Sequence, residues 1–183
     1  MPHNEGSGEE GEYQRLLGAL KTAGFRVTAP RRALLRVLSQ TREPLSVPEL
    51  FEAVNVFAAA APPGDEPVNL VTVYRFANLL VDLKLARRVE FGQGYYRYER
   101  EEPQTGPHHH HLVCERCGRV EDFHGCDVAD LAARLESESG FAIARHQLEM
   151  YGTCPDCRSA ADPPARLVVE EKEAAERAER AAD

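Results

Sequence analysis

The first half of the chain carries apolar residues at helical spacing in four segments, which predict four helices. The first spans residues 13–23, and Gly24 follows it, as a glycine commonly follows a helix. Thr28 can cap the second, whose first turn contains Pro30, where a missing amide costs no helical hydrogen bond. The apolar stripe of this second helix consists of Leu34, Leu35, Val37 and Leu38.

The third and fourth predicted helices form a helix-turn-helix candidate. Ser46 and Glu49 have the spacing of a capping box, so the third helix begins at Ser46. The fourth begins at Val71 or Thr72 and directs toward the core Val73, Phe76, Leu79, Leu80 and Leu83. Residues 55–69 connect the two helices over more positions than a compact turn needs, and they are rich in Ala, Pro and Gly. We expect a mobile surface insertion there.

Strand patterns follow the helices. Residues 87–99 hold two β-favouring runs around a glycine-containing turn, which predicts a hairpin in the position of a wing. A polar stretch at 101–107 then marks a boundary, after which further strands are predicted at 110–114, 118–123 and 141–151 and a helix at 127–139. The predicted fold class is α+β, with an N-terminal winged helix-turn-helix domain followed by a small α/β domain.

The predicted domain organisation has five parts. They are a disordered acidic tail (1–12), a winged-helix DNA-binding domain (13–100), a hinge (101–107), a zinc-binding domain (108–160) and a charged tail (161–183). The last part favours helix but lacks an apolar stripe strong enough to dock.

Charge is divided along the chain in a way that the net charge of −8 conceals. Residues 13–100 contain 13 Lys and Arg against 8 Asp and Glu, whereas residues 101–183 contain 9 against 18. The basic part can therefore face DNA phosphates despite the acidic total. The sequence has no apolar run long enough for a membrane span and no secretory signal, so we expect a cytoplasmic protein with no membrane partner.

Four of the five cysteines form two Cys-x-x-Cys pairs, which in a reducing compartment indicate a metal site more than disulfides. Four thiolates complete a tetrahedral, closed zinc site that holds a domain together and leaves no position for catalysis. The predicted ligands are Cys114, Cys117, Cys154 and Cys157. Cys126 stands apart, and we expect it to be a half-buried thiol.

Four consecutive histidines precede the first cysteine pair. In an extended strand, His108 and His110 share one side while His109 and His111 share the other, so one run can begin two metal sites. Imidazoles completed by carboxylates suit divalent Zn, Fe or Mn. The alternatives are a purification tag, which the internal position disfavours, and a solvated histidine patch.

Several ordered motifs resemble the ferric uptake regulator family over most of residues 16–157. They are LKTAGFRVTAPRRALLRVL, VTVYRFANLLVDLKLARRVE, HHHHLVCERCGRVEDF and ARHQLEMYGTCPDC. The resemblance implies a homodimer, joined through the second domain, that binds a palindromic double-stranded DNA operator. It also implies that Arg26 reaches the minor groove and that Tyr74 and Arg75 face the major groove, although Tyr74 could instead pack in the core.

The resemblance also implies two metal sites besides the four-cysteine zinc. His109, His111 and Glu99 match a site between the two domains, with Asp122 where the family commonly has Glu. His108, His110 and His146 match a second site, for which Asp127 and Asp130 flank the expected carboxylate without matching it. One departure stands out, because Pro44 occupies the place where the family's iron regulators commonly have a histidine. The zinc-sensing branch tends to have a cysteine near position 99, which is absent here, so the metal identity stays open among Fe²⁺, Mn²⁺ and Zn²⁺.

The leading hypothesis is a metal-responsive repressor of metal-homeostasis genes, in which bound metal fixes the angle between the winged helices. A peroxide sensor of the same family is the alternative. A zinc deaminase would need a His-x-Glu before a Pro-Cys-x-x-Cys, and the only His-x-Glu here begins at His3 in the acidic tail. A thioredoxin-like protein would need its Cys-x-x-Cys at a helix start after a βαβ pattern. We therefore expect a regulator and not an enzyme.

Overall fold

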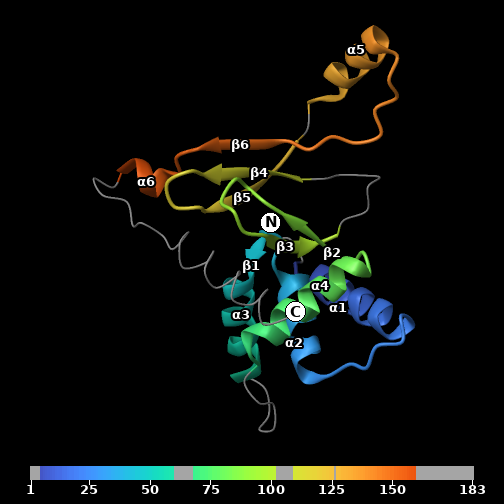
Figure 1. Ribbon diagram of the computed structural model, residues 1–183, viewed down its shortest axis with the longest axis vertical. Helices are drawn as coiled ribbons and strands as arrows, with labels where there is room; N and C mark the ends of the chain where they lie inside the picture. Colours follow the sequence, from blue (N-terminus) through green and yellow to red (C-terminus); the bar gives the residue numbers. More distant parts are fainter. Residues whose placement is uncertain (1–4, 60–67, 102–108, 126, 160–183) are drawn as a thin grey trace. The chain divides into compact units, whose positions relative to one another are not determined.

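The structure is a computed structural model that describes residues 5–59, 68–101, 109–125 and 127–159. The chain divides into two compact units, and the boundary between them falls directly after Glu101 (Figure 1). His108, Cys126, the middle of the insertion and the charged tail lie outside the described residues.

The first unit is a helical domain with a small sheet. Its elements are α1 (Glu5–Thr22), α2 (Ala29–Gln40), β1 (Leu45–Ser46), α3 (Val47–Ala59), α4 (Leu70–Asp82), β2 (Ala86–Val89) and β3 (Arg97–Arg100). The sheet has the order β1-β3-β2 with antiparallel pairs, so the predicted hairpin forms and β1 adds a third strand. Leucines from all four helices, among them Leu16, Leu35, Leu50 and Leu80, are fully buried in one core. This arrangement is the expected winged helix-turn-helix.

The first helix begins at Glu5, eight residues before the predicted start, so residues 5–12 are helical where we expected disorder. A tertiary contact explains the difference. Arg36 of α2 pairs with the carboxylate of Glu10 and lies over the ring of Tyr13, 3.7 Å from its centroid. The local sequence, with three glycines, gives no sign of this contact, which ties the helix start to α2.

The capping box at α3 is confirmed. The Ser46 amide donates to Glu49 Oε2 over 2.8 Å, and the Glu49 amide returns a 3.4 Å bond to Ser46 Oγ. The helix then continues to Ala59, so the connection to α4 is shorter than predicted. The side chain of Asn55, which lies in α3, accepts a 3.0 Å hydrogen bond from the Val68 amide. This bond links α3 to the segment directly before α4.

Replacing Ser46 with Ala is expected to lower the free energy of unfolding by about 0.5–2 kcal/mol, because the Glu49 amide loses its capping partner. Thermal unfolding followed by circular dichroism measures the change. Thr28→Ala is the matched control, since Thr28 precedes α2 without any side-chain cap bond. Equal losses in the two variants would contradict the assignment of the cap.

The second unit is built on a three-stranded sheet. Its elements are β4 (His109–Cys114), β5 (Val120–His124), α5 (Ala129–Ser139), β6 (Glu149–Gly152) and α6 (Pro155–Ser159). The strand order is β5-β4-β6, with β5 antiparallel and β6 parallel to β4. The predicted α/β composition is therefore present.

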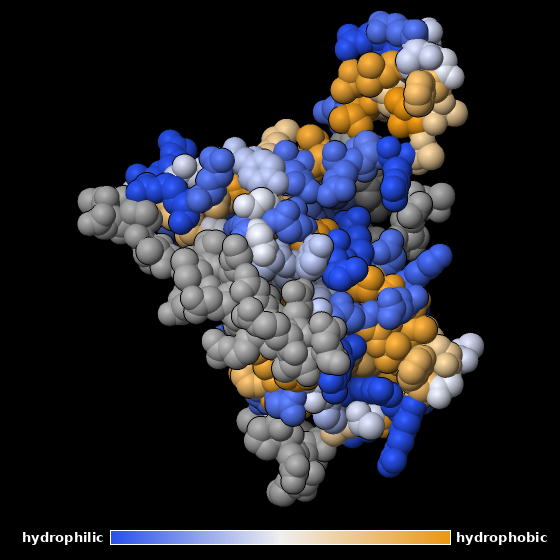
Figure 2. Space-filling model, viewed as in Figure 1, coloured by the Kyte–Doolittle hydropathy of each residue, from blue (hydrophilic) through white to orange (hydrophobic). Residues whose placement is uncertain are grey.

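The strand predicted at 141–151 is confirmed only from Glu149 onward. The apolar alternation that suggested a longer strand belongs to exposed side chains, with Phe141 75% and Ile143 37% exposed. Helix α5 likewise buries none of its residues, and Leu131 and Leu135 face solvent. Figure 2 shows hydrophobic side chains gathered over α5 and the segment that follows it. The sequence pattern thus marks an apolar surface that the other described residues do not cover.

Candidate functional site

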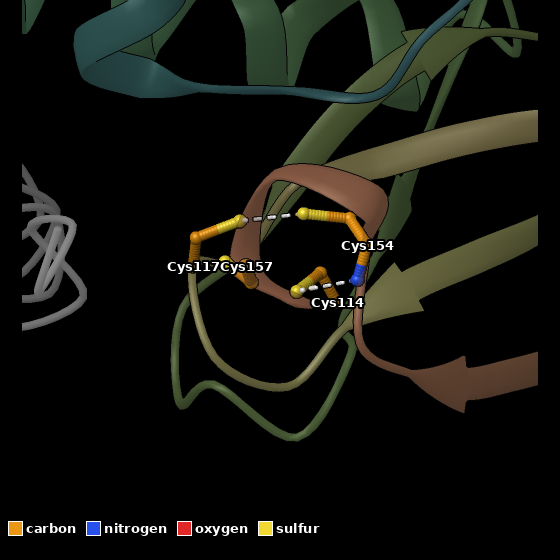
Figure 3. A group of neighbouring side chains, drawn as sticks. All are labelled: Cys114, Cys117, Cys154 and Cys157. Atoms are coloured by element: carbon orange, nitrogen blue, oxygen red, sulfur yellow. Dashed lines mark hydrogen bonds between the residues drawn. The ribbon is translucent and has the colours of Figure 1, made fainter. Parts of the chain in front are cut away.

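The four predicted zinc ligands come together in the second unit. Cys114 ends β4, Cys117 lies in the turn toward β5, Cys154 precedes α6 and Cys157 lies within it (Figure 3). Their sulfurs all lie within 4.8 Å of one another. The Sγ atoms of Cys117 and Cys154 are 3.7 Å apart, and tetrahedral zinc with Zn–S bonds of about 2.3 Å needs about 3.8 Å. The cluster therefore fits a structural zinc ion.

Burial and hydrogen bonding act in opposite directions on the Cys114 thiol. Burial raises its pKa, but backbone amides of Cys154, Cys117 and Arg116 donate to the sulfur and lower the pKa to about 6. The pKa of Cys157 is raised to about 12, first by burial and then by the neighbouring sulfurs. Because one thiolate opposes the next, all four can be charged together only around a cation, which is what zinc supplies.

The turn that carries the first cysteine pair is held by the backbone. The Cys114 amide donates to the Arg119 carbonyl over 2.8 Å, and the Gly118 amide donates to the Cys114 carbonyl over the same distance. Gly118 has φ +72°, a conformation that glycine adopts without strain. The Glu115 amide donates to Gly152 over 2.9 Å, which links this turn to the end of β6. The first cysteine pair is thus joined by its backbone to the strand that precedes the second pair.

His109, His111 and Asp122 share one face of the β4–β5 pair. His111 lies directly opposite Asp122 in the sheet register, and its Nδ1 is 3.2 Å from Asp122 Oδ1. The ring centroids of His109 and His111 are 5.0 Å apart. Two imidazoles on one zinc, with Zn–N bonds of about 2.0–2.1 Å, have centroids about 5 Å apart.

A buried carboxylate oxygen completes this set. Oδ2 of Asp122 is buried and makes no hydrogen bond with any described residue. Such an oxygen costs free energy unless it gains a partner, and a divalent metal is one. The residues on this face therefore fit a divalent metal.

His110 points to the other face of β4. Its ring centroid lies 5.2 Å from that of His146, which is in the segment before β6, and 5.3 Å from that of Phe123. The first separation again suits two imidazoles on one metal. Asp127 and Asp130, at the start of α5, are exposed.

Glu99 lies in β3 of the first unit. Its side chain is 1% exposed and forms an ion pair with Arg87, which stands directly opposite it in the hairpin. Pro44 is buried, and its carbonyl accepts a 3.3 Å hydrogen bond from Arg97. Arg97 also pairs with Glu49 over 2.8 Å, so an arginine anchors the start of α3 to the hairpin.

The three predicted DNA-binding residues all lie in the first unit. Arg26 is exposed in the segment before α2, and Arg75 is exposed in the first half of α4. Tyr74 is partly buried and packs against the core. Both sequence interpretations of Tyr74 thus retain support, because one part of the ring is packed and the rest is accessible.

His124 is a residue that the sequence analysis missed. It stands opposite His109 in the sheet register, and the two ring centroids are 6.4 Å apart. It is exposed at the end of β5, two residues after Asp122. The signal in the sequence was the alternation of β5, which places His124 and Asp122 on one face.

Comparison with known proteins finds relatives among bacterial regulators. The sequence profile of the Ferric uptake regulator family matches residues 22–151. The "Ferric uptake regulation protein" of Neisseria gonorrhoeae is 32% identical over 78% of this chain and 93% of its own length. The "Peroxide-responsive repressor PerR" of Staphylococcus epidermidis is 23% identical over 80% of this chain and 91% of its own length.

The chain is also similar to a solved structure of a ferric uptake regulator. The Vibrio cholerae ferric uptake regulator matches with a TM-score of 0.60 and 34% identity, over 75% of this chain and 98% of the other. Within the described residues, no helix has the length and apolar character needed to cross a membrane.

Proposed function

This chain belongs to the ferric uptake regulator family, and we propose that it is a cytoplasmic repressor of metal-homeostasis genes that binds its operator when loaded with Fe²⁺, Mn²⁺ or Zn²⁺. The observation that carries the proposal is the pairing of two kinds of metal site in one unit. A closed set of four sulfurs suits permanent zinc, whereas a mixed set of imidazole and carboxylate suits exchangeable metal.

The sensory metal is proposed to be bound by His109, His111, Asp122 and Glu99. Its role is to favour the arrangement of the two domains that fits DNA. A metal shifts a conformational equilibrium only by its differential affinity for the two states. A coupling of about 1–3 kcal/mol, typical of allostery, changes operator affinity by about 5- to 150-fold. His108, His110 and His146 are assigned to the second site, which lies within one domain and stiffens it.

The protein is proposed to act as a homodimer joined through its second unit. The support is an apolar surface that the other described residues leave exposed, formed by Leu131, Leu135, Phe141 and Ile143. A second copy that covers this surface would give the two winged helices the two-fold symmetry of a palindromic operator.

Peroxide sensing is the second candidate, and the similarity to a peroxide-responsive repressor favours it. In that case His109 and His111 would hold iron, which would supply the chemistry by which hydrogen peroxide adds one oxygen atom to a ligand histidine with the loss of water. Mass spectrometry of the iron-loaded protein after peroxide treatment separates the candidates. A gain of one oxygen at His109 or His111 supports the peroxide sensor, and unmodified histidines support a plain metal sensor.

Replacing Arg75 with Ala is expected to weaken operator binding by about 1–3 kcal/mol if its guanidinium contacts a base in the major groove. Fluorescence anisotropy with a duplex recovered by in vitro selection measures the loss, and zinc content and oligomeric state should not change. An equal loss on random-sequence DNA would instead assign Arg75 to a phosphate.

A further inference from the structure

The two residues that precede Glu99 in strand β3 contact both helices of the helix-turn-helix. Nη1 of Arg97 lies 2.8 Å from Glu49 Oε2 in the first turn of α3. The Tyr98 hydroxyl donates a 3.1 Å hydrogen bond to Asn78 Oδ1 of α4. Of the four ligands proposed for the sensory metal, only Glu99 lies in the first unit. The strand that carries this ligand is therefore attached to α3 and to α4.

Arg97 holds the start of α3 through several bonds from one buried guanidinium. Its side chain is 5% exposed, and Nη1 donates both to Glu49 Oε2 and, over 3.3 Å, to the Pro44 carbonyl. Nη2 donates to the Tyr95 hydroxyl over 2.9 Å. The same Oε2 atom of Glu49 accepts from the Ser46 amide, so the arginine and the helix cap share one oxygen. Separating a buried, hydrogen-bonded pair is strongly unfavourable, so β3 and the start of α3 move together.

Tyr98 attaches β3 to α4 from the opposite face of the strand. Successive side chains of a strand alternate, so Arg97 and Glu99 share one face and Tyr98 points to the other. Its ring is fully buried in the helical core, and its hydroxyl is bound to Asn78. The strand therefore cannot slide along α4 without exposing the ring or breaking the hydrogen bond.

Strand pairing alone would hold β3 less firmly. On one side β1 contributes only two residues, Leu45 and Ser46, which stand opposite Tyr98 and Arg97. On the other side β2 and β3 have four residues each, and an isolated hairpin of two strands is only marginally stable in water. The side-chain contacts are therefore needed if a shift of Glu99 is to reach the helices.

We propose that Arg97 and Tyr98 are positioning residues, which transmit the effect of metal binding from Glu99 to α3 and α4. The inference rests on the proposed function, since it takes Glu99 as a ligand of the sensory metal. The metal favours one position of Glu99, and the two contacts make the helices follow that position. The start of α3 contributes none of the four proposed ligands, because Pro44 cannot ligate. Its link to the metal therefore runs through Arg97, to which the Pro44 carbonyl is bonded.

The test uses the double variant Arg97→Met with Glu49→Gln. Both charges of the pair are removed together, because removing one alone would leave the other buried without it. Gln at this position preserves the capping box of α3. Arg36→Met with Glu10→Gln is the matched control, since it removes an ion pair of the same unit that joins α1 to α2. Thermal unfolding shows whether both double variants are folded.

Operator affinity is measured by anisotropy with and without whichever of Fe²⁺, Mn²⁺ and Zn²⁺ gives the largest response in the wild type. The ratio of the two affinities should be about 2- to 30-fold smaller in the Arg97 double variant than in the wild type, and unchanged in the control. Competition with a fluorescent chelator, in the absence of DNA, should give a metal affinity close to that of the wild type, because no proposed ligand is altered.

The possible results separate the inference from the proposed function. A purely structural role of Arg97 would lower operator affinity equally with and without metal and leave the ratio unchanged. An unchanged ratio in the folded double variant therefore overturns the inference while the proposed function stands. A smaller ratio that arises from weaker metal binding also overturns it, because Arg97 would then act on the ligand and not on the helices. A wild type without any metal response overturns the proposed function itself.

Tyr98→Phe keeps the inference testable if the double variant fails to fold. It removes only the hydroxyl that donates to Asn78 and leaves the ring in the core. The metal response should fall by about twofold or more. Tyr13→Phe, at another buried tyrosine of the same core, should leave the response unchanged. Equal responses in these two variants would overturn the inference.

Hydrogen exchange followed by mass spectrometry measures the same link without DNA. In the wild type, the added metal should slow amide exchange in β3 and also in residues 44–50 at the start of α3. In the Arg97 double variant only the slowing in β3 should remain. If the metal changed the exchange of residues 44–50 equally in the two proteins, the inference would be wrong.

Discussion

Replacing Cys114 with Ser is expected to release one zinc ion per chain and to unfold the second unit. Cys114 ends the central strand β4, and its cluster joins the β4–β5 turn to the start of α6. The sheet has only three short strands, and α5 buries no residue, so little apolar packing remains to hold the unit. Structural zinc contributes about 10–16 kcal/mol in small domains, which is more than such a unit can lose.

Elemental analysis and thermal unfolding of Cys114→Ser measure these two effects. The helices of the first unit should persist, because they have a separate core. Cys126→Ser serves as the control, since Cys126 is not among the four predicted ligands, and it should keep both its zinc and its melting profile. Retention of zinc and of the wild-type profile by Cys114→Ser would refute the four-cysteine site.

Replacing His109 and His111 together with Ala is expected to abolish metal-dependent DNA binding while the four-cysteine zinc remains. These side chains lie on the face of β4 that carries Asp122, and their ring separation of 5.0 Å suits a shared metal. Loss of two imidazole ligands leaves Asp122 and Glu99, which are too few to hold an exchangeable metal at cellular concentrations. The variant should therefore lose the whole of the proposed 5- to 150-fold response.

The matched control is the double variant of His108 and His110. His110 lies on the opposite face with Phe123 and His146, so its metal is proposed to stiffen one unit only. Its loss should reduce the metal response and not remove it. If this variant lost the response while the His109 and His111 variant kept it, the two faces would be assigned to the wrong sites.

Features set by local geometry could be predicted from the sequence. The Ser46–Glu49 cap depends on two residues three positions apart, and the cysteine pairs depend on spacing within a knuckle. The faces of β4 follow from strand alternation alone, whereas the contacts of His111 with Asp122 and of His110 with His146 were implied by the resemblance to the family. In each case the pattern that carries the prediction lies within a few residues of the chain.

Features set by distant contacts could not be predicted. The start of α1 depends on Arg36 of another helix. The segment before β6 has the apolar pattern of a strand, but Phe141 and Ile143 remain exposed. An apolar surface that binds another chain has the same sequence pattern as an apolar surface that packs inside its own chain.

The central claim is that metal at the sensory site controls DNA binding, and one titration tests it directly. The protein is stripped of exchangeable metal with a chelator mild enough to leave one zinc per chain, and its affinity for a selected operator is measured by anisotropy as Fe²⁺, Mn²⁺ or Zn²⁺ is added. The account predicts that at least one metal raises operator affinity by about 5- to 150-fold, and that renewed chelation reverses the effect. Equal operator affinity with and without every one of these metals would contradict it.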